Sequence, residues 1–272
     1  MPLLHIAVLA LIQGVTEFLP ISSQAHLILT SMGLHWQDQG LLMDVALHVG
    51  TLAAVLVYFW RDVWRMAKGL GSALGGAVNA GARLGLQIVL ATLPVMATGY
   101  FLIDHAERLR DPLVIGWATL GFGVLLYLAD RFGLRVRRVE HMTFGGALVI
   151  GLAQICALIP GTSRSGVTMT AGRMLGFERE EAARFSLLLA IPAILAAGTL
   201  EGIRLYEMGN AELTRDAFLA AGLAFFSALA AIALMMAWLR HATFTPFVLY
   251  RVVLGAGLVA FVYFGVLPSG WF

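Results

Sequence analysis

The stretch Gln13-Gly-Val-Thr-Glu-Phe-Leu-Pro-Ile-Ser-Ser-Gln-Ala-His26 interrupts an apolar segment that extends from residue 2 to residue 34. A second stretch, Pro160-Gly-Thr-Ser-Arg-Ser-Gly166, interrupts another apolar segment between residues 143 and 176. Irregular backbone at membrane depth is stable only where it is buried in protein or lines a wet cavity. We therefore predict two re-entrant helical hairpins, and we name their polar turns the first elbow (residues 13–26) and the second elbow (residues 160–166).

The composition of the whole chain agrees with a membrane protein. Of its 272 residues, 60% are hydrophobic and only 12% are charged, and the mean hydropathy is +0.85. Soluble domains carry about 25% charged residues, so this chain cannot cover a water-facing surface. A soluble enzyme, a disordered protein and a nucleic-acid binder are excluded, and the net charge of +2 suggests no anionic polymer as a partner. The single Cys156 excludes an internal disulfide.

Outside the two elbows, the chain contains apolar stretches close to the length of about 20 residues that a membrane-spanning helix needs. They predict an all-α polytopic membrane protein with six transmembrane helices and two re-entrant hairpins in one integral membrane domain, residues 1–272. The predicted spans are Leu41–Trp60, Leu84–Ile103, Pro112–Ala129, Phe185–Leu200, Ala217–Leu239 and Phe247–Leu267.

The two halves of the chain, approximately residues 1–135 and 136–272, resemble each other. Phe18-Leu-Pro-Ile-Ser-Ser23 matches Leu158-Ile-Pro-Gly-Thr-Ser163, and Pro112-Leu-Val-Ile matches Pro246-Phe-Val-Leu. Each half then has one hairpin and three spans, and an odd number of spans inverts the second half relative to the first. Inverted repeats place their sites near the midplane, where the two elbows can meet.

Orientation follows from the basic residues. Most of the 18 Lys and Arg residues fall on the side that holds the predicted loops 61–83 and 130–142. The positive-inside rule makes this side the cytoplasm, so both termini are expected on the outer face.

The first elbow carries the residue types of a catalytic site. Gln13 and Glu17 are four residues apart and share one helix face. Ser22, Ser23 and His26 begin the return segment after the proline, where an anionic ligand would meet unpaired backbone N–H groups. Ionisable groups at this depth are costly and point to function.

The second elbow has the composition of an oxyanion site. The planar guanidinium of Arg164 matches phosphate oxygens, and glycines allow a backbone to approach a ligand closely. The residues expected to bind substrate beside Arg164 are Gly161, Thr162, Ser163, Ser165 and Gly166.

Simpler interpretations exist for several of these groups. Glu17 and Arg164 could form a purely architectural ion pair, or carbonyls and hydroxyls of a broken helix could satisfy Arg164. Asp44 and His48, four residues apart, either orient a ligand or form a hydrogen bond between helices. Arg251 lies close to the cytoplasmic end of its predicted span, so we expect it to extend to the interface.

The combination of these groups favours attack on a phosphorus centre. Either Ser23 or His26 could be the nucleophile or the proton carrier, and Arg164 would neutralise charge on the phosphoryl oxygens. Glu17 would hold a divalent metal or act as a general base.

Both elbows resemble the two signature motifs of undecaprenyl-diphosphate phosphatase, the bacitracin-resistance family, and the resemblance extends to Phe-Val-Leu-Tyr-Arg251. It implies an inverted-repeat enzyme of the bacterial inner membrane, with its site open to the outer face, that recycles the cell-wall carrier lipid. It also implies dependence on Mg²⁺ or Ca²⁺. The family's positions fall on Gln13, Glu17, Ser22, Ser23, His26, Ser163 and Arg164.

This sequence departs from some family members in two places. Gln24-Ala25 replaces Thr-Gly, so Gln24 receives no role, and the neutral Gln13 leaves one carboxylate fewer for a metal. The expected partners are a polyprenyl diphosphate and membrane lipids, without nucleic acid, and a homodimer is compatible with the sequence. The competing class is an inverted-repeat transporter or flippase for an anionic substrate or lipid carrier, which needs no nucleophile.

Overall fold

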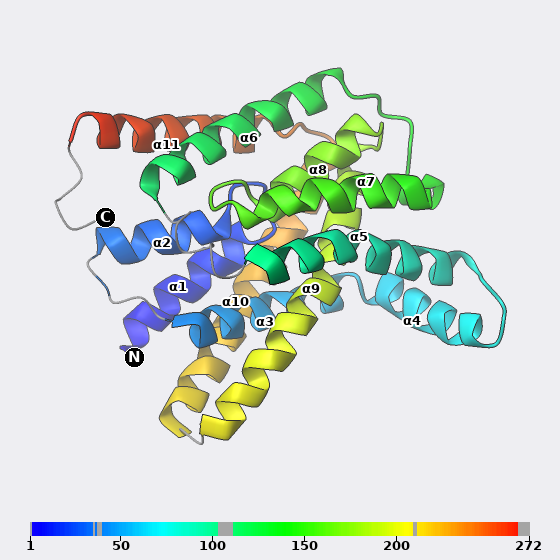
Figure 1. Cartoon of the computed structure of the whole chain (residues 1–272), viewed down its shortest axis with the longest axis horizontal. Helices are drawn as coiled ribbons and strands as arrows, with labels where there is room; N and C mark the ends of the chain where they lie inside the picture. Colours follow the sequence, from blue (N-terminus) through cyan, green and yellow to red (C-terminus); the bar gives the residue numbers. More distant parts are fainter. Residues whose placement is uncertain (1, 35, 37–39, 103–110, 209–210, 266–272) are drawn as a thin grey trace.

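The computed structural model describes residues 2–34, 36, 40–102, 111–208 and 211–265, and the elements in these ranges are all helices (Figure 1). A single isolated bridge between Arg137 and Phe177 is the one β-type pairing in these ranges. The elements, in chain order, are α1 (Leu3–Thr16), α2 (Ser23–Gly33), α3 (Gly40–Tyr58), α4 (Trp60–Leu74), α5 (Ala80–Leu102), α6 (Pro112–Phe132), η2 (Val139–His141), α7 (Phe144–Gln154), η3 (Ile155–Leu158), α8 (Arg164–Met174), α9 (Arg179–Met208), α10 (Ala211–Leu239) and α11 (Thr245–Tyr263).

Each elbow joins two short helices that pack against each other, α1 with α2 and α7 with α8. The breaks fall at Ser22, with φ of 72°, and at Ser163, with φ of 69°. These two are the only residues other than glycine with positive φ in the described part of the chain. Such a conformation is rare for a residue with a Cβ atom, and here it directly precedes the first residue of α2 and of α8. The two helix-break-helix units predicted from the sequence are therefore present.

Four helices in the described ranges are long and apolar enough to cross a membrane: Ala80–Phe101, Pro112–Phe132, Leu213–Leu239 and Thr245–Tyr263. The chain is thus a multi-pass membrane protein. The predicted span Phe185–Leu200 lies inside the longer α9, while Ile103 and Leu267, the predicted ends of two spans, lie outside the described residues.

The predicted span Leu41–Trp60 and the loop after it need correction. The helix ends at Tyr58, and α4 follows at an angle of 86° over residues predicted as part of loop 61–83. The charged residues of α4 hid its helical character in a search for apolar stretches.

The first helix of each hairpin packs against a long helix from the other half of the chain. α1 packs on α10 and α7 packs on α5, and both contacts depend on a glycine. A Cβ atom at Gly14 would lie 2.8 Å from the carbonyl oxygen of Ala224, and one at Gly151 would lie 2.4 Å from that of Ala91. Two other close pairs, α3 with α10 and α6 with α11, complete the arrangement (Figure 1).

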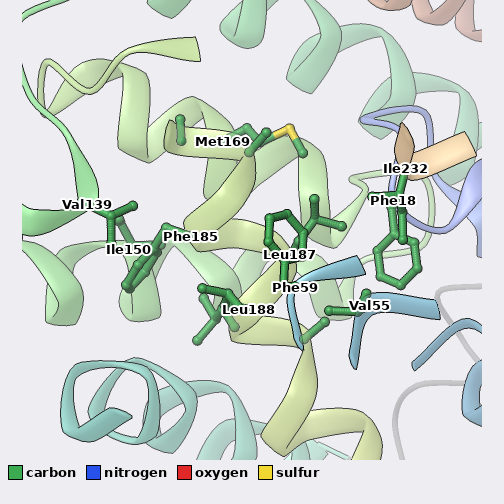
Figure 2. Packing of buried hydrophobic residues seen from close by; sticks show 14 of the residues in the cluster. Phe18, Val55, Phe59, Val139, Ile150, Met169, Phe185, Leu187, Leu188 and Ile232 are labelled. Atoms are coloured by element: carbon green, nitrogen blue, oxygen red, sulfur yellow. The ribbon is translucent and has the colours of Figure 1, made fainter. Parts of the chain in front are cut away.

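One buried apolar cluster connects these helices to the first elbow. Phe18 of the elbow belongs to the same cluster as Val55 of α3, Leu187 of α9 and Ile232 of α10 (Figure 2). Phe18 is fully buried, so burial of apolar surface holds the elbow in the protein interior.

A separate buried charge network lies at the far end of α8. Arg173, fully buried, places its Nε 3.1 Å from Oδ1 of Asp130, and Arg179 Nε lies 2.7 Å from the same oxygen. Arg173 also donates to the carbonyls of Leu134 and Phe177. Charges buried in this way are stable because each is paired or hydrogen-bonded.

Candidate active site

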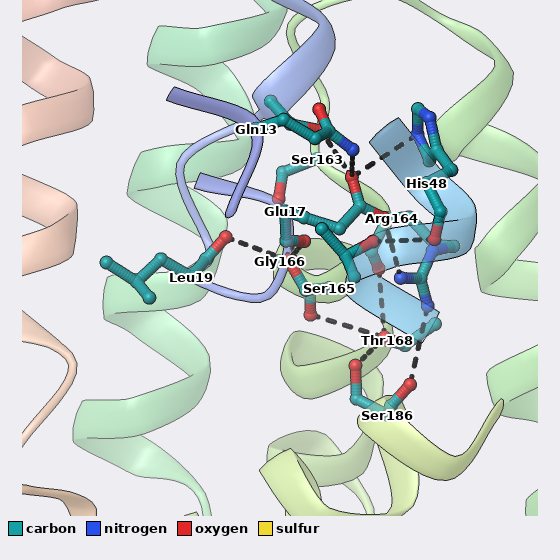
Figure 3. Close-up of polar contacts among 12 residues, drawn as sticks. Gln13, Glu17, Leu19, His48, Ser163, Arg164, Ser165, Gly166, Thr168 and Ser186 are labelled. Atoms are coloured by element: carbon teal, nitrogen blue, oxygen red, sulfur yellow. Dashed lines mark hydrogen bonds and ion pairs between the residues drawn. The ribbon is translucent and has the colours of Figure 1, made fainter. Parts of the chain in front are cut away.

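The two elbows meet in the protein interior. The Ser165 hydroxyl in the second elbow donates to the Leu19 carbonyl in the first, with 2.9 Å between the oxygens (Figure 3). Side chains more than a hundred residues apart in sequence thereby share one site, as the sequence predicted.

Glu17 is the centre of this site. It is the C-cap of α1, where its backbone N–H donates to the Gln13 carbonyl, and it is only 7% exposed. Its Oε2 accepts from the Gln13 amide at 3.0 Å and from the Ser23 hydroxyl at 2.6 Å. Its Oε1 lies 3.0 Å from Nη2 of Arg164. One carboxylate thus joins groups from α1, α2 and α8, and Figure 3 shows Glu17 beside Gln13 and Arg164.

Ser23 is the first residue of α2, and its contact with Glu17 has chemical consequences. Because a carboxylate oxygen can only accept, the Ser23 hydroxyl donates its hydrogen to Glu17. A serine in this geometry can transfer that proton as its oxygen attacks an electrophile. The N-terminus of α2 provides the local environment that favours negative charge.

Arg164 is the first residue of α8, and its side chain faces Glu17 from the second elbow. Its Nη1 lies 3.4 Å from the Ser186 carbonyl, and its side chain is 18% exposed. Within the described residues, these contacts and the Glu17 pair leave guanidinium N–H groups for a ligand. The ion pair between Glu17 and Arg164, given above as the simpler alternative, is present. The same carboxylate also binds Ser23, which is positioned for proton transfer.

The remaining residues of the second elbow shape the turn. Ser163 accepts from the Gly166 N–H at 3.1 Å as the N-cap of α8. A Cβ atom at Gly161, which has φ of +93°, would lie 2.5 Å from the Ile115 carbonyl oxygen. A Cβ atom at Gly166 would lie 2.7 Å from Nη1 of Arg251. Gly161 and Gly166 therefore both pack closely against other protein atoms. The buried Thr162 hydroxyl has no hydrogen-bond partner among the residues that the structure describes.

The first elbow holds a comparable unpaired group. Gln13 is fully buried, and its Oε1 has no partner in the described ranges although its Nε2 donates to Glu17. The Ser22 hydroxyl accepts from the Ala25 N–H at 3.4 Å and so caps α2. Gln13 therefore presents an acceptor next to Glu17, whereas Ser22 supports the helix that carries Ser23.

His26 does not contact Glu17 in the structure. Its Nδ1 lies 2.6 Å from the Ser22 carbonyl, and its Nε2 lies 2.5 Å from the Tyr250 hydroxyl of α11. The carbonyl can only accept, so Nδ1 carries the hydrogen and a neutral ring accepts from Tyr250 through Nε2. Both ring nitrogens of His26 are occupied.

His48 of α3 is the site residue whose role the sequence left open. Its Nδ1 donates to the Asp44 carbonyl at 2.7 Å, and its Nε2 lies 3.4 Å from Oε2 of Glu17. An ion pair with Glu17 requires a hydrogen on Nε2 as well, which is the imidazolium form. The contact with Asp44 is to its backbone carbonyl within α3, so it is not the hydrogen bond between helices that the sequence analysis offered. Only the packing of α3 shows that His48 faces Glu17.

The prediction for Arg251 is wrong. Its side chain is fully buried and donates to carbonyls of both elbows instead of extending to the interface. Distance from the end of a span does not reveal such partners, because the elbows that supply them lie far away in sequence.

Comparison with known proteins agrees with this geometry. Residues 6–257 match the family described as bacitracin resistance protein BacA. The chain belongs to the BacA family. It is 52% identical to undecaprenyl-diphosphatase 1 of Rhodospirillum rubrum, with 97% of each chain covered. It is 49% identical to the undecaprenyl-diphosphatase of Roseobacter denitrificans, with 97% of this chain and 100% of the relative covered.

The site of this BacA-family chain does not fit a divalent cation held by Glu17. The described residues contain no group of three or more His, Cys, Asp or Glu side chains that could hold a metal. Ser23, Gln13 and Arg164 all donate to the Glu17 carboxylate. A cation there would have to displace a donor, and the free Oε1 of Gln13 is one neutral ligand only.

Substitution of His48 tests its contact with Glu17. We expect His48→Leu to lower kcat about tenfold or more, because a hydrogen bond to a charged group is lost. His48→Gln, which retains an N–H donor at similar reach, should restore activity to within about threefold of wild type. Steady-state kinetics on folded, purified protein provides the comparison. Equal losses in both variants would show that the imidazole itself transfers a proton.

Proposed function

We propose that this chain hydrolyses undecaprenyl diphosphate to undecaprenyl phosphate and inorganic phosphate at the cluster formed by Glu17, Ser23 and Arg164. Two relatives that are about half identical to this chain over nearly its full length are undecaprenyl-diphosphatases, which supports this activity. The observation that supports the location is the 2.6 Å contact between the Ser23 hydroxyl and Glu17, with Arg164 on the other carboxylate oxygen.

In the proposed reaction the Ser23 oxygen attacks the terminal phosphorus while Glu17 accepts its proton. A bond forms between that oxygen and phosphorus, and the bond from phosphorus to the bridging oxygen breaks. Undecaprenyl phosphate leaves and takes the proton from Glu17. Water then attacks the phosphorus while Glu17 accepts a proton from it, the bond from phosphorus to the Ser23 oxygen breaks, and Glu17 returns the proton to that oxygen as inorganic phosphate leaves. Arg164 stabilises the charge on the phosphoryl oxygens. Ser23 is favoured over His26 as nucleophile because the two ring nitrogens of His26 have other partners.

The other predicted residues either bind the substrate or shape the elbows around it. Buried polar atoms without partners are costly, so the free oxygens of Gln13 and Thr162 favour a polar ligand beside them. Ser22 and Ser163 shape the N-termini of α2 and α8, together with Ser165, Gly161 and Gly166. His26 supports the start of α2 through its contacts with the Ser22 carbonyl and the Tyr250 hydroxyl. A divalent cation, Mg²⁺ or Ca²⁺, would be bound by the substrate diphosphate and not by Glu17.

For the membrane arrangement we propose six spans and two re-entrant hairpins in an inverted repeat within one domain, residues 1–272. The exchange of packing partners, α1 on α10 and α7 on α5, supports this symmetry. The excess of basic residues on one side supports an orientation with that side in the cytoplasm, and we infer that the site opens to the outer face of the bacterial inner membrane.

Phosphate release is the experiment that tests this function. Purified protein should release inorganic phosphate from undecaprenyl diphosphate, whereas a transporter or flippase would release none. Chelation of divalent cations should raise KM more than it lowers kcat. Glu17 already has positively charged partners, so the cation is expected to act on substrate binding and not on Glu17. Spheroplasts that overproduce the protein should also hydrolyse a membrane-impermeant short prenyl diphosphate without lysis. Activity that appears only after lysis would reverse the proposed orientation.

A further inference from the structure

Arg251 of α11 is a fully buried cation without a carboxylate partner in the described part of the chain. Its guanidinium donates instead to backbone carbonyls. Nε lies 3.0 Å from the Thr119 oxygen, and Nη1 lies 3.1 Å from the Pro20 oxygen. Nη2 lies 2.9 Å from the Thr162 oxygen and 3.1 Å from that of Gly161. A buried charge is tolerated only when such bonds satisfy it.

These acceptors come from three separate segments. Pro20 belongs to the first elbow, Gly161 and Thr162 belong to the second, and Thr119 belongs to α6. Pro20 precedes Ser23 by three residues, and Thr162 precedes Arg164 by two. One planar group therefore fixes the backbone just before Ser23 and just before Arg164, two of the three residues that the proposed reaction requires.

The surrounding glycines fit this arrangement. A Cβ atom at Gly166 would lie 2.7 Å from Nη1 of Arg251, and a Cβ at Gly123 of α6 would lie 3.0 Å from the Arg251 Cβ. The guanidinium is enclosed by protein, and carbonyls occupy its three nitrogens. This distinguishes Arg251 from Arg164, whose side chain is 18% exposed.

We propose that Arg251 is a positioning residue that sets the distance between Ser23 and Arg164 by binding the carbonyls of both elbows. The inference rests on the proposed function, because it assigns Arg251 a part in the same reaction. A lysine has one charged nitrogen on a flexible chain and cannot bind carbonyls in three directions with a planar fork. Misplacement of reacting groups by about 1 Å can cost about 10²-fold in rate.

A double-mutant cycle on purified protein tests the proposal. Arg251→Lys should lower kcat about 10²-fold in wild type. The Arg164→Lys background has already lost the guanidinium that Arg251 positions. In that background, Arg251→Lys should lower kcat only about threefold. Arg173→Lys is the matched control, because Arg173 is equally buried but binds Asp130 at the other end of α8. Its effect should be the same factor in both backgrounds.

Rates are normalised to folded protein, measured by thermal unfolding in detergent. If Arg251→Lys does not fold, Gly123→Ala replaces it, because the added methyl group displaces the Arg251 side chain and retains its charge. Equal factors in both backgrounds for Arg251→Lys or Gly123→Ala would reduce Arg251 to a purely structural role. Absence of phosphate release by the wild-type protein would instead overturn the proposed function, so the two failures are distinguishable.

Discussion

Ser23→Ala should lower kcat for phosphate release by about 10³-fold or more, because removal of a nucleophile leaves only the contributions of binding and electrostatics. Substrate affinity should change little, since the alanine variant retains Arg164 and the N-termini of both return helices. Initial rates over a range of substrate concentrations, with binding of the lipid measured separately, test both parts.

Ser22→Ala is the matched comparison. Ser22 directly precedes Ser23, but its hydroxyl accepts from the Ala25 N–H. Within the described residues, this hydroxyl makes no contact with Glu17. We expect a loss of about tenfold or less, mainly in KM, from a weaker helix cap. A Ser23→Ala enzyme with a tenth or more of wild-type kcat would rule out Ser23 as the nucleophile.

Arg164→Lys should impair catalysis almost as severely as Arg164→Ala, with kcat reduced about 10²-fold or more in each. A lysine retains the charge, but it loses the planar fork that can bind Glu17 and two phosphoryl oxygens together. The measurement is kcat and KM for both variants at matched expression and folding. Near-normal turnover by Arg164→Lys would show that the site requires only a point charge.

The main features of the fold could be predicted because they depend on local chemistry. Proline and hydroxyl residues within apolar segments correctly indicated both breaks, and the structure contains them at Ser22 and Ser163. The pairing of Glu17 with Arg164 was considered only as the simpler, architectural alternative, and the structure contains this pair within the site. Composition predicted a membrane protein, and the apolar stretches of about 20 residues predicted that it is helical.

The remaining features depend on tertiary packing, which a single sequence taken by itself does not reveal. His48 faces Glu17 only because α3 packs beside the first elbow, and Arg251 is buried only because both elbows turn toward α11. His26 was placed with Ser23 by spacing, yet its ring points to Tyr250 of α11. The bend of 86° between α3 and α4 also escaped prediction, because a charged helix lacks the apolar signal of a span.

The central claim is that Ser23 attacks the terminal phosphate, and trapping the intermediate tests it most directly. Protein mixed with undecaprenyl diphosphate labelled in its terminal phosphate is quenched with acid within one turnover, and its peptides are analysed by mass spectrometry. We predict label on the peptide that contains Ser23, as an acid-stable phosphoserine that is absent from Ser23→Ala. Because acid destroys phosphohistidine, a parallel sample is quenched with alkali. Label on His26 in that sample would contradict the proposed mechanism.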